Sequence, residues 1–153
     1  MKAEKRIKEL GIELPELAVS KTLFLPVKLV GNTLYVSGQL PFAEGKLAYT
    51  GKVGNEVTLE QAREAARLCV INLLAVLKAY LGNLDRVKSI VKLQVFVSSE
   101  EHFTQQHVAA DAASQLLIDI FGDCGRHSRT AAGLCSLAMD APVEVDGIVE
   151  IQG

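Results

Sequence analysis

The chain has 153 residues, 49% of them hydrophobic, with 16 basic and 18 acidic side chains and a net charge of −2. A chain of this length and composition builds one hydrophobic core, so we expect a single domain over residues 1–153. No run of Lys and Arg interleaved with aromatic residues is present, which argues against nucleic acid as a ligand. The first ten residues are charged and lack the apolar stretch of a signal peptide, and no later apolar run is long enough to cross a bilayer. We therefore expect a cytoplasmic protein without membrane contact.

The N-terminal third is predicted to form a short arm followed by a hairpin. Residues 3–10 place two apolar side chains among charged ones, which is typical of a short surface helix, and Gly11 ends it. Residues 23–30 have the apolar and β-branched content of a strand, and residues 33–37 alternate as a second strand after a Gly-Asn turn. Residues 38–41 end this strand, and a glycine-rich loop follows.

The clearest helix signal begins at Thr58, which forms a capping box with Gln61. Apolar residues then recur at i, i+3, i+4 and i+7 spacing as far as Leu81, and Gly82 ends the helix. The apolar face is wide, as in helices that cover one side of a sheet.

The second half of the chain alternates strands with one helix. Residues 87–97 are the strongest strand candidate, and the Ser-Ser-Glu-Glu cluster at 98–101 is predicted to cap a helix over 103–121. Two further runs, 128–137 and 143–151, are predicted to form a pair of strands separated by a turn.

This order of elements predicts an α+β fold, with a mixed β-sheet and two main helices on one face. Two helices cannot cover both faces of the sheet. We therefore expect the bare face to pack against copies of itself in an oligomer.

The most informative string is Gly125-Arg-His-Ser-Arg129-Thr130, which leads into an apolar strand. A largely buried guanidinium nearly always holds an anion, and Arg129 is predicted to be buried. The anion is either a protein carboxylate, with Glu144 on a later strand as the candidate, or the carboxylate of a ligand. In the first case Arg129 and Glu144 pair with each other across adjacent strands.

His127 and Arg126 have two interpretations each. The imidazole of His127 is either a second donor to an anion, with a role in proton transfer, or a histidine exposed in a loop. Arg126 is either a rim residue or an intersubunit charge. Neither a metal nor a nucleotide cofactor is predicted, because metal-spaced ligands and a phosphate-binding glycine loop are missing. The cysteines are predicted to be reduced and mostly buried: Cys69, Cys124 and Cys135.

Three groups of short strings, in this order and spacing, form a specific pattern: residues 30–41 (VGNTLYVSGQLP), 82–87 (GNLDRV) with 91–97 (VKLQVFV), and 128–130 (SRT) with 143–145 (VEV). Over about residues 25–151 the chain resembles the YjgF or RidA-like family, which includes reactive enamine/imine deaminases and proteins called L-PSP endoribonucleases. Its longer N-terminal arm resembles a subgroup of slightly longer members.

The resemblance implies a chorismate-mutase-like homotrimer of the trimeric αβ type, in which the sheets form a central barrel and ligand clefts lie between subunits. In that family an arginine matching Arg129 holds the carboxylate of a 2-imino or 2-enamino acid, and a glutamate matching Glu144 helps to position water. The resemblance also implies that the cleft is lined by Ser37, Gly38 and Gln39, and by Asp111 from a neighbouring subunit.

Three features depart from the family pattern, one of which is that Leu137-Ala138 replaces a Leu-Pro pair. Phe24 keeps an aromatic ring but lacks the hydroxyl of the family residue, and Ala131 replaces a cysteine that contributes mainly its backbone N–H. Two hypotheses for the function therefore remain open. One is a hydrolase of reactive 2-enamino or 2-imino acids or related small carboxylated compounds, and the other is a non-catalytic protein that binds a small carboxylated metabolite. An endoribonuclease is a weaker third alternative.

Overall fold

A computed structural model describes residues 2–17 and 21–153 of the chain. The main sheet contains strands β1 (Val27–Val30), β2 (Thr33–Gln39), β5 (Val87–Ser98), β6 (Ser128–Leu134) and β7 (Val143–Ile151). A separate small hairpin is formed by β3 (Phe42–Ala43) and β4 (Lys46–Leu47). The helices are α1 (Ala3–Glu9), α2 (Leu59–Leu81) and α3 (Gln106–Phe121), and 3₁₀ turns span Leu84–Arg86, Gly122–Gly125 and Ala138–Asp140.

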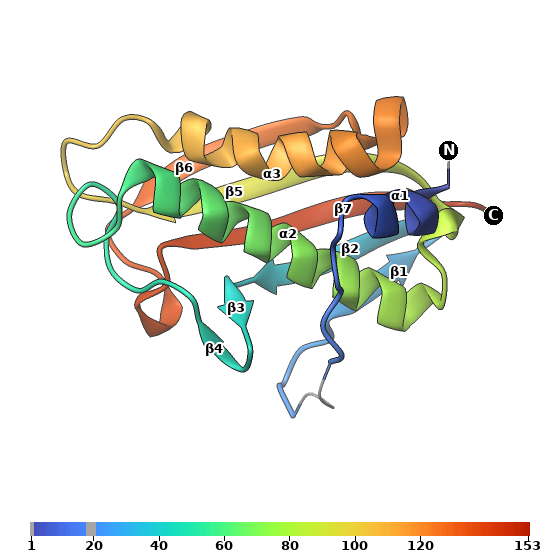
Figure 1. Cartoon of the computed structure of the whole chain (residues 1–153). Coiled ribbons are helices and arrows are strands. Elements are labelled where there is room, and N and C mark those ends of the chain that lie inside the picture. The colour runs from blue at the N-terminus through green and yellow to red at the C-terminus, as the bar shows by residue number, and fades with distance from the viewer. Residues whose placement is uncertain (1, 18–20) are drawn as a thin grey trace.

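The five strands lie in the order β1-β2-β7-β5-β6, and α2 and α3 cover one face of this sheet (Figure 1). Every neighbouring pair is antiparallel except β5 and β6, which are parallel. The predicted α+β fold with a mixed sheet is thus confirmed. The last two strands, however, do not pair with each other as predicted, because β5 lies between them. Helix α3 provides the long crossover that a parallel connection needs, and it carries β6 to the outer edge.

The core lies between the helices and the sheet. Along β7 the residues alternate strictly between buried and partly exposed, so one face of the strand points to the helices and the other to the open side. Helix α2 begins at the predicted capping box, in which the Thr58 side chain accepts from the Gln61 backbone N–H and Gln61 reciprocates. The largest fully buried side chains include Leu34, Leu73, Leu74, Leu77, Leu93, Leu117 and Ile120.

Several predicted boundaries were wrong, and β2 for example continues to Gln39 and does not end at residue 37. The first strand begins at Val27 and not at residue 23, since Pro26 has no backbone N–H for a ladder and the preceding apolar side chains are exposed. The second main helix begins at Gln106, because Glu101 and His102 form a turn, residues 103–105 are irregular, and no side chain caps the helix start. Strand β6 ends at Leu134. The prediction that the cysteines are mostly buried was wrong: Cys69 of α2 is buried, but Cys124 in the 3₁₀ turn after α3 and Cys135 just after β6 are exposed.

The glycine-rich segment after β2 contains a short hairpin that sequence periodicity did not indicate. Asn72 of α2 is buried and holds this segment, because its side-chain amide donates to the backbone carbonyls of Leu40 and Phe42 at 2.9 and 3.1 Å. The segment that follows β2 is thereby fixed to the helical face of the sheet.

Candidate functional site

The residues predicted for the site fall into two groups on opposite faces of the sheet. Arg129 is the register partner of Leu93, a fully buried residue that points toward the helices. Glu144 is the register partner of Phe96, three residues further along the same strand, and therefore faces the open side. Arg129 and Glu144 cannot pair with each other in one chain, which excludes one of the two interpretations of Arg129 within a subunit.

Arg129 is held by helix α3. Its Nη1 donates to Asp111 Oδ1 at 2.8 Å and to Ser114 Oγ at 3.1 Å, and its Nη2 donates to the backbone carbonyl of His107 at 3.4 Å. The Arg129 side chain is 21% exposed and that of Asp111 is 59% exposed. The resemblance implied an Asp111 supplied by a neighbouring subunit, but this carboxylate meets Arg129 within the same chain.

His127 lies one residue before β6. Its ring contacts Ser114, the same hydroxyl that Arg129 contacts. Its Nδ1 is 2.6 Å from the carbonyl oxygen of Gly125, and its Nε2 is 2.9 Å from Ser114 Oγ. His127 is only partly exposed, so it is not a free loop histidine. A cavity of about 340 Å³ opens here, and it is lined by Ser114, Ile118, Arg126, His127 and Arg129. Two guanidinium groups and a hydroxyl make this cavity suited to a small anion.

Ala131 follows Arg129 on the same face of β6 and packs against the hydrophobic core. It therefore contributes no polar side-chain atom to the contacts around Arg129.

Glu144 occupies a niche on the open face beside Gly38, where its carboxylate lies close to the glycine backbone. A Cβ atom at position 38 would clash with the Oε2 atom of Glu144 and lie 2.9 Å from its Cδ. The pairing of β2 with β7 shifts between Val36 and Gln39, and this irregularity brings Gly38 over the carboxylate. Burial raises the pKa of the Glu144 carboxyl, and the nearby charge of Asp146 raises it further.

Asp146 extends this carboxylate group by two residues along β7. Burial raises its pKa too, while the charge of Lys92 opposes that shift. The Gln94 amide, with its nitrogen turned toward Asp146, donates to both carboxylate oxygens at 3.1 and 3.2 Å. The open face thus carries two neighbouring carboxyl groups whose pKa values are raised, a property common at functional sites.

The other residues of the predicted cleft do not gather around Glu144. Ser37 Oγ donates to the backbone carbonyl of Leu25 at 2.7 Å. Gln39 is the register partner of Val145, which is buried on the helical face, and it lines a separate cavity beside Phe42. The Phe24 side chain is 62% exposed. Within residues 37–39, Gly38 lies against the Glu144 carboxylate, whereas the Ser37 hydroxyl is hydrogen-bonded to the backbone before β1.

Sequence reasoning missed Ser114 and Asp146. Ser114 lies three residues after Asp111 on α3, a spacing that places both on one helical face. Asp146 lies two residues after Glu144 in a strand, which places both on one sheet face. Both spacings can be seen in the sequence. Assigning these residues to a site also required the register between β5 and its neighbouring strands.

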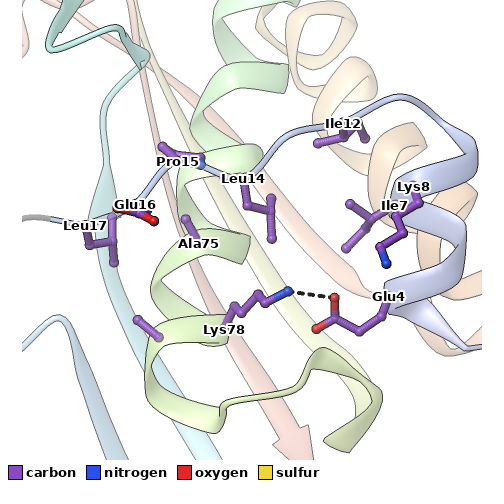
Figure 2. Close-up of a pocket in the computed structure, with 11 residues that line it drawn as sticks. Glu4, Ile7, Lys8, Ile12, Leu14, Pro15, Glu16, Leu17, Ala75 and Lys78 are labelled. Carbon is purple, nitrogen blue, oxygen red and sulfur yellow. Dashed lines mark hydrogen bonds and ion pairs between the residues drawn. The ribbon is translucent and has the colours of Figure 1, made fainter.

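A larger cavity lies beneath the N-terminal arm (Figure 2). It has a volume of about 520 Å³ and is bounded by α1, by residues 12–17 and by α2. Glu4 and Lys78 form an ion pair at 2.9 Å at its edge, as Figure 2 shows, and Glu4 also accepts from the backbone N–H of Leu84. Its lining is otherwise mainly aliphatic, and it includes no residue that was predicted for the site.

In residues 2–17 and 21–153, no three His, Cys, Asp or Glu side chains gather in a way that would hold a metal ion. Within the same described ranges, no helix has both the length and the apolar character to cross a membrane.

The helices on one face of a mixed sheet, the carboxyl groups on its bare face and the arginine on its edge strand define a chorismate-mutase-like α+β protein. Residues 4–143 match the model of the family described as YjgF/chorismate mutase-like, putative endoribonuclease. The chain belongs to this family.

Relatives and solved structures agree with this assignment. The Trypanosoma cruzi protein TCP17 is 42% identical over 146 residues, which cover 95% of this chain and 91% of that protein. The crystal structure of Atu1372 from Agrobacterium tumefaciens is 45% identical, with a TM-score of 0.90 over 97% of this chain and 91% of that one. A structure from Shewanella oneidensis, called a putative endoribonuclease, is 34% identical, with a TM-score of 0.94 over 99% of this chain and all of that one. The Escherichia coli YjgF structure, at 18% identity and a TM-score of 0.64 over 87% of this chain and 91% of that one, shares the fold.

Proposed function

We propose that the protein hydrolyses reactive 2-enamino or 2-imino acids, or related small carboxylated compounds. The observation that carries this proposal is the partly buried Glu144 carboxyl, seated on Gly38 with its pKa raised. Hydrolysis of a carbon–nitrogen double bond needs a held water and a proton for the departing nitrogen. A carboxyl group that exchanges its proton closer to neutral pH serves both tasks.

The Arg129 guanidinium binds the substrate carboxylate in this proposal. Its Nε and one N–H of Nη2 make no hydrogen bond to any residue in the described part of the chain, so a fork of donors remains. Arg129 and Glu144 lie on opposite faces of one sheet, and a single substrate reaches both only if they belong to different copies. Strand β6 is an edge strand, so it is available to a neighbour. A site between subunits of a homotrimer satisfies these requirements.

The protein is therefore expected to be a trimer in solution. Its open sheet face and edge strands need a partner, and the partner completes the site. Light scattering coupled to size-exclusion chromatography at micromolar concentration checks this, with an expected mass near three times 16.5 kDa. A monomeric mass would end the intersubunit proposal.

Arg129→Lys is expected to weaken binding of a small 2-oxo acid by about 10- to 100-fold, because an ammonium cannot reproduce a bidentate fork. The remaining positive charge still pairs with Asp111, so the fold and the trimer should persist. Isothermal titration calorimetry measures the affinity. An unchanged Kd would mean that Arg129 only joins β6 to α3.

A non-catalytic metabolite-binding protein is the second candidate. It is favoured by Phe24, an exposed ring without the hydroxyl that would orient water, and by the apolar Ala131. The endoribonuclease named for the Shewanella relative is a third candidate, which the net charge of −2 disfavours.

One assay separates these candidates. The protein is added to a PLP-dependent serine or threonine dehydratase, and release of the keto acid is followed with and without it. Acceleration over the buffer rate supports the hydrolase, and its absence with several 2-imino acids supports the binding protein. Cleavage of a labelled single-stranded RNA by the same preparation would instead support the ribonuclease.

A further inference from the structure

Arg129, Ser114 and His127 form a chain of hydrogen bonds whose direction follows from their chemistry. A guanidinium only donates, so Ser114 Oγ accepts from Arg129 Nη1 at 3.1 Å. A carbonyl only accepts, so His127 Nδ1 carries a proton and donates to Gly125 at 2.6 Å. In the neutral ring, Nε2 then holds a lone pair, and the Ser114 hydroxyl donates to it at 2.9 Å.

These contacts resemble those of an activated hydroxyl nucleophile. The hydroxyl has a base within hydrogen-bonding distance, and a third group fixes the orientation and tautomer of that base. The guanidinium beside Ser114 Oγ favours the negative charge that develops when the hydroxyl loses its proton. Here the backbone carbonyl of Gly125 orients the ring.

The surrounding cavity supplies the other parts of a reaction site. It measures about 340 Å³, enough for a small molecule, and Ile118 offers it an apolar wall. Arg126 pairs with Asp123 at 3.7 Å, but both side chains are largely exposed, so this ion pair is weak and leaves Arg126 free for a ligand anion. The unused N–H groups of Arg129 lie on a side chain that already contacts Ser114, where they can donate to an oxyanion.

We propose that this cavity is an acyl-transfer site for small carboxylated esters, with Ser114 as the nucleophile and His127 as the general base. Ser114 Oγ forms a bond to the ester carbonyl carbon while its proton moves to His127 Nε2. The bond from that carbon to the ester oxygen then breaks, and the departing alcohol takes the proton from the imidazolium. Water releases the acid from Ser114 by the same steps, so the net reaction is ester hydrolysis. This proposal shares the Arg129 donors with the proposed imine hydrolysis, but it does not use Glu144, which lies on the other face of the sheet within one chain.

The test uses the full chain and an aryl fluorophosphonate, which forms a stable phosphonyl ester with an activated serine and releases fluoride. We expect mass spectrometry of the digested protein to find the adduct on Ser114. Ser114→Ala should remove the adduct, and His127→Gln should slow its formation by about 100-fold. Ser128→Ala is the matched control. Ser128 begins the neighbouring strand and its hydroxyl donates to the carbonyl of Val91, so its loss should leave labelling unchanged.

Turnover tests the substrate class. With 4-nitrophenyl hemisuccinate, a carboxylated ester, Arg126→Ala should raise KM about tenfold while KM for 4-nitrophenyl acetate stays the same. An equal effect on both esters would overturn the role of Arg126. Absence of an adduct on Ser114 in the folded protein, or equal labelling of wild type and His127→Gln, would overturn the nucleophile. Labelling that persists in Glu144→Gln shows that this site does not depend on the imine-hydrolysing carboxyl.

Discussion

Glu144→Gln is expected to lower the rate of 2-imino acid hydrolysis by about 10²- to 10⁴-fold, the usual contribution of general acid–base catalysis. Glutamine keeps the shape that fits over Gly38 but cannot exchange a proton. Binding of a 2-oxo acid, measured by calorimetry, should survive because Arg129 supplies it. The rate is measured as keto-acid release in the coupled dehydratase assay.

Glu150→Gln is the matched control for this variant. Glu150 lies on the same strand and the same face, but Lys88 and Ser89 hydrogen-bond its carboxylate and lower its pKa. Its loss should leave the hydrolytic rate at the wild-type level. Equal rates for wild type and Glu144→Gln, both above the buffer rate, would remove Glu144 from the mechanism.

The same substitution should change how stability depends on pH. The pKa of Glu144 is raised in the folded state, so folding favours the protonated carboxyl. This contribution is fully present below the unfolded pKa and is lost as the pH rises through the raised folded value. Chemical denaturation should therefore show wild type losing stability in that window, with a shallower decline for Glu144→Gln. Some decline should remain in the variant, because the pKa of Asp146 is also raised.

Gly125→Ala is expected to destabilise the protein by about 1–3 kcal/mol, the usual cost of inserting a methyl group into a closely packed position. The new Cβ would clash with the carbonyl oxygen of Leu117 and lie 2.8 Å from its carbonyl carbon, and backbone atoms of a helix cannot move aside alone. Because the Gly125 carbonyl holds His127, labelling of Ser114 should also slow. Urea denaturation measures the loss of stability.

Gly147→Ala provides the comparison. Gly147 is also buried, but its added Cβ would meet its nearest neighbours at 3.4 Å, an ordinary contact distance. We expect little change or a small gain in stability, because alanine restricts the unfolded chain more than glycine does. Equal destabilisation by both substitutions would mean that the close approach of Gly125 to α3 is not what matters.

The sequence predicted the ends of helices best where a side chain within a few residues bonds to the backbone at that end. The start of α2 was predicted to within one residue because Thr58 and Gln61 form their capping box without help from the rest of the fold. The start of α3 has no such cap, and the predicted start was three residues too early. The start of β1, next to Pro26, was also predicted too early. An apolar run alone does not reveal which of its residues pair with a neighbouring strand.

The candidate site was only partly predictable, because it depends on strand order. Arg129 and Glu144 were both identified as site residues, but adjacency in sequence suggested adjacent strands. Insertion of β5 between β6 and β7 separates them, and the register of each strand with β5 places the two side chains on opposite faces. The same register brings Ser114 and Asp111 of α3 to Arg129, a contact that helical periodicity alone does not specify.

The position of β7 has a consequence for how the chain folds. The last strand in chain order lies in the middle of the sheet, with β2 on one side and β5 on the other. The β1–β2 hairpin and the β5–α3–β6 unit can each form from local contacts, yet neither pairs with the other until β7 enters between them. Because residues 33–39 and 143–151 are far apart in sequence, loop closure must precede this step and slow it. During synthesis on the ribosome, the two halves should therefore wait with exposed strand edges until the final strand emerges.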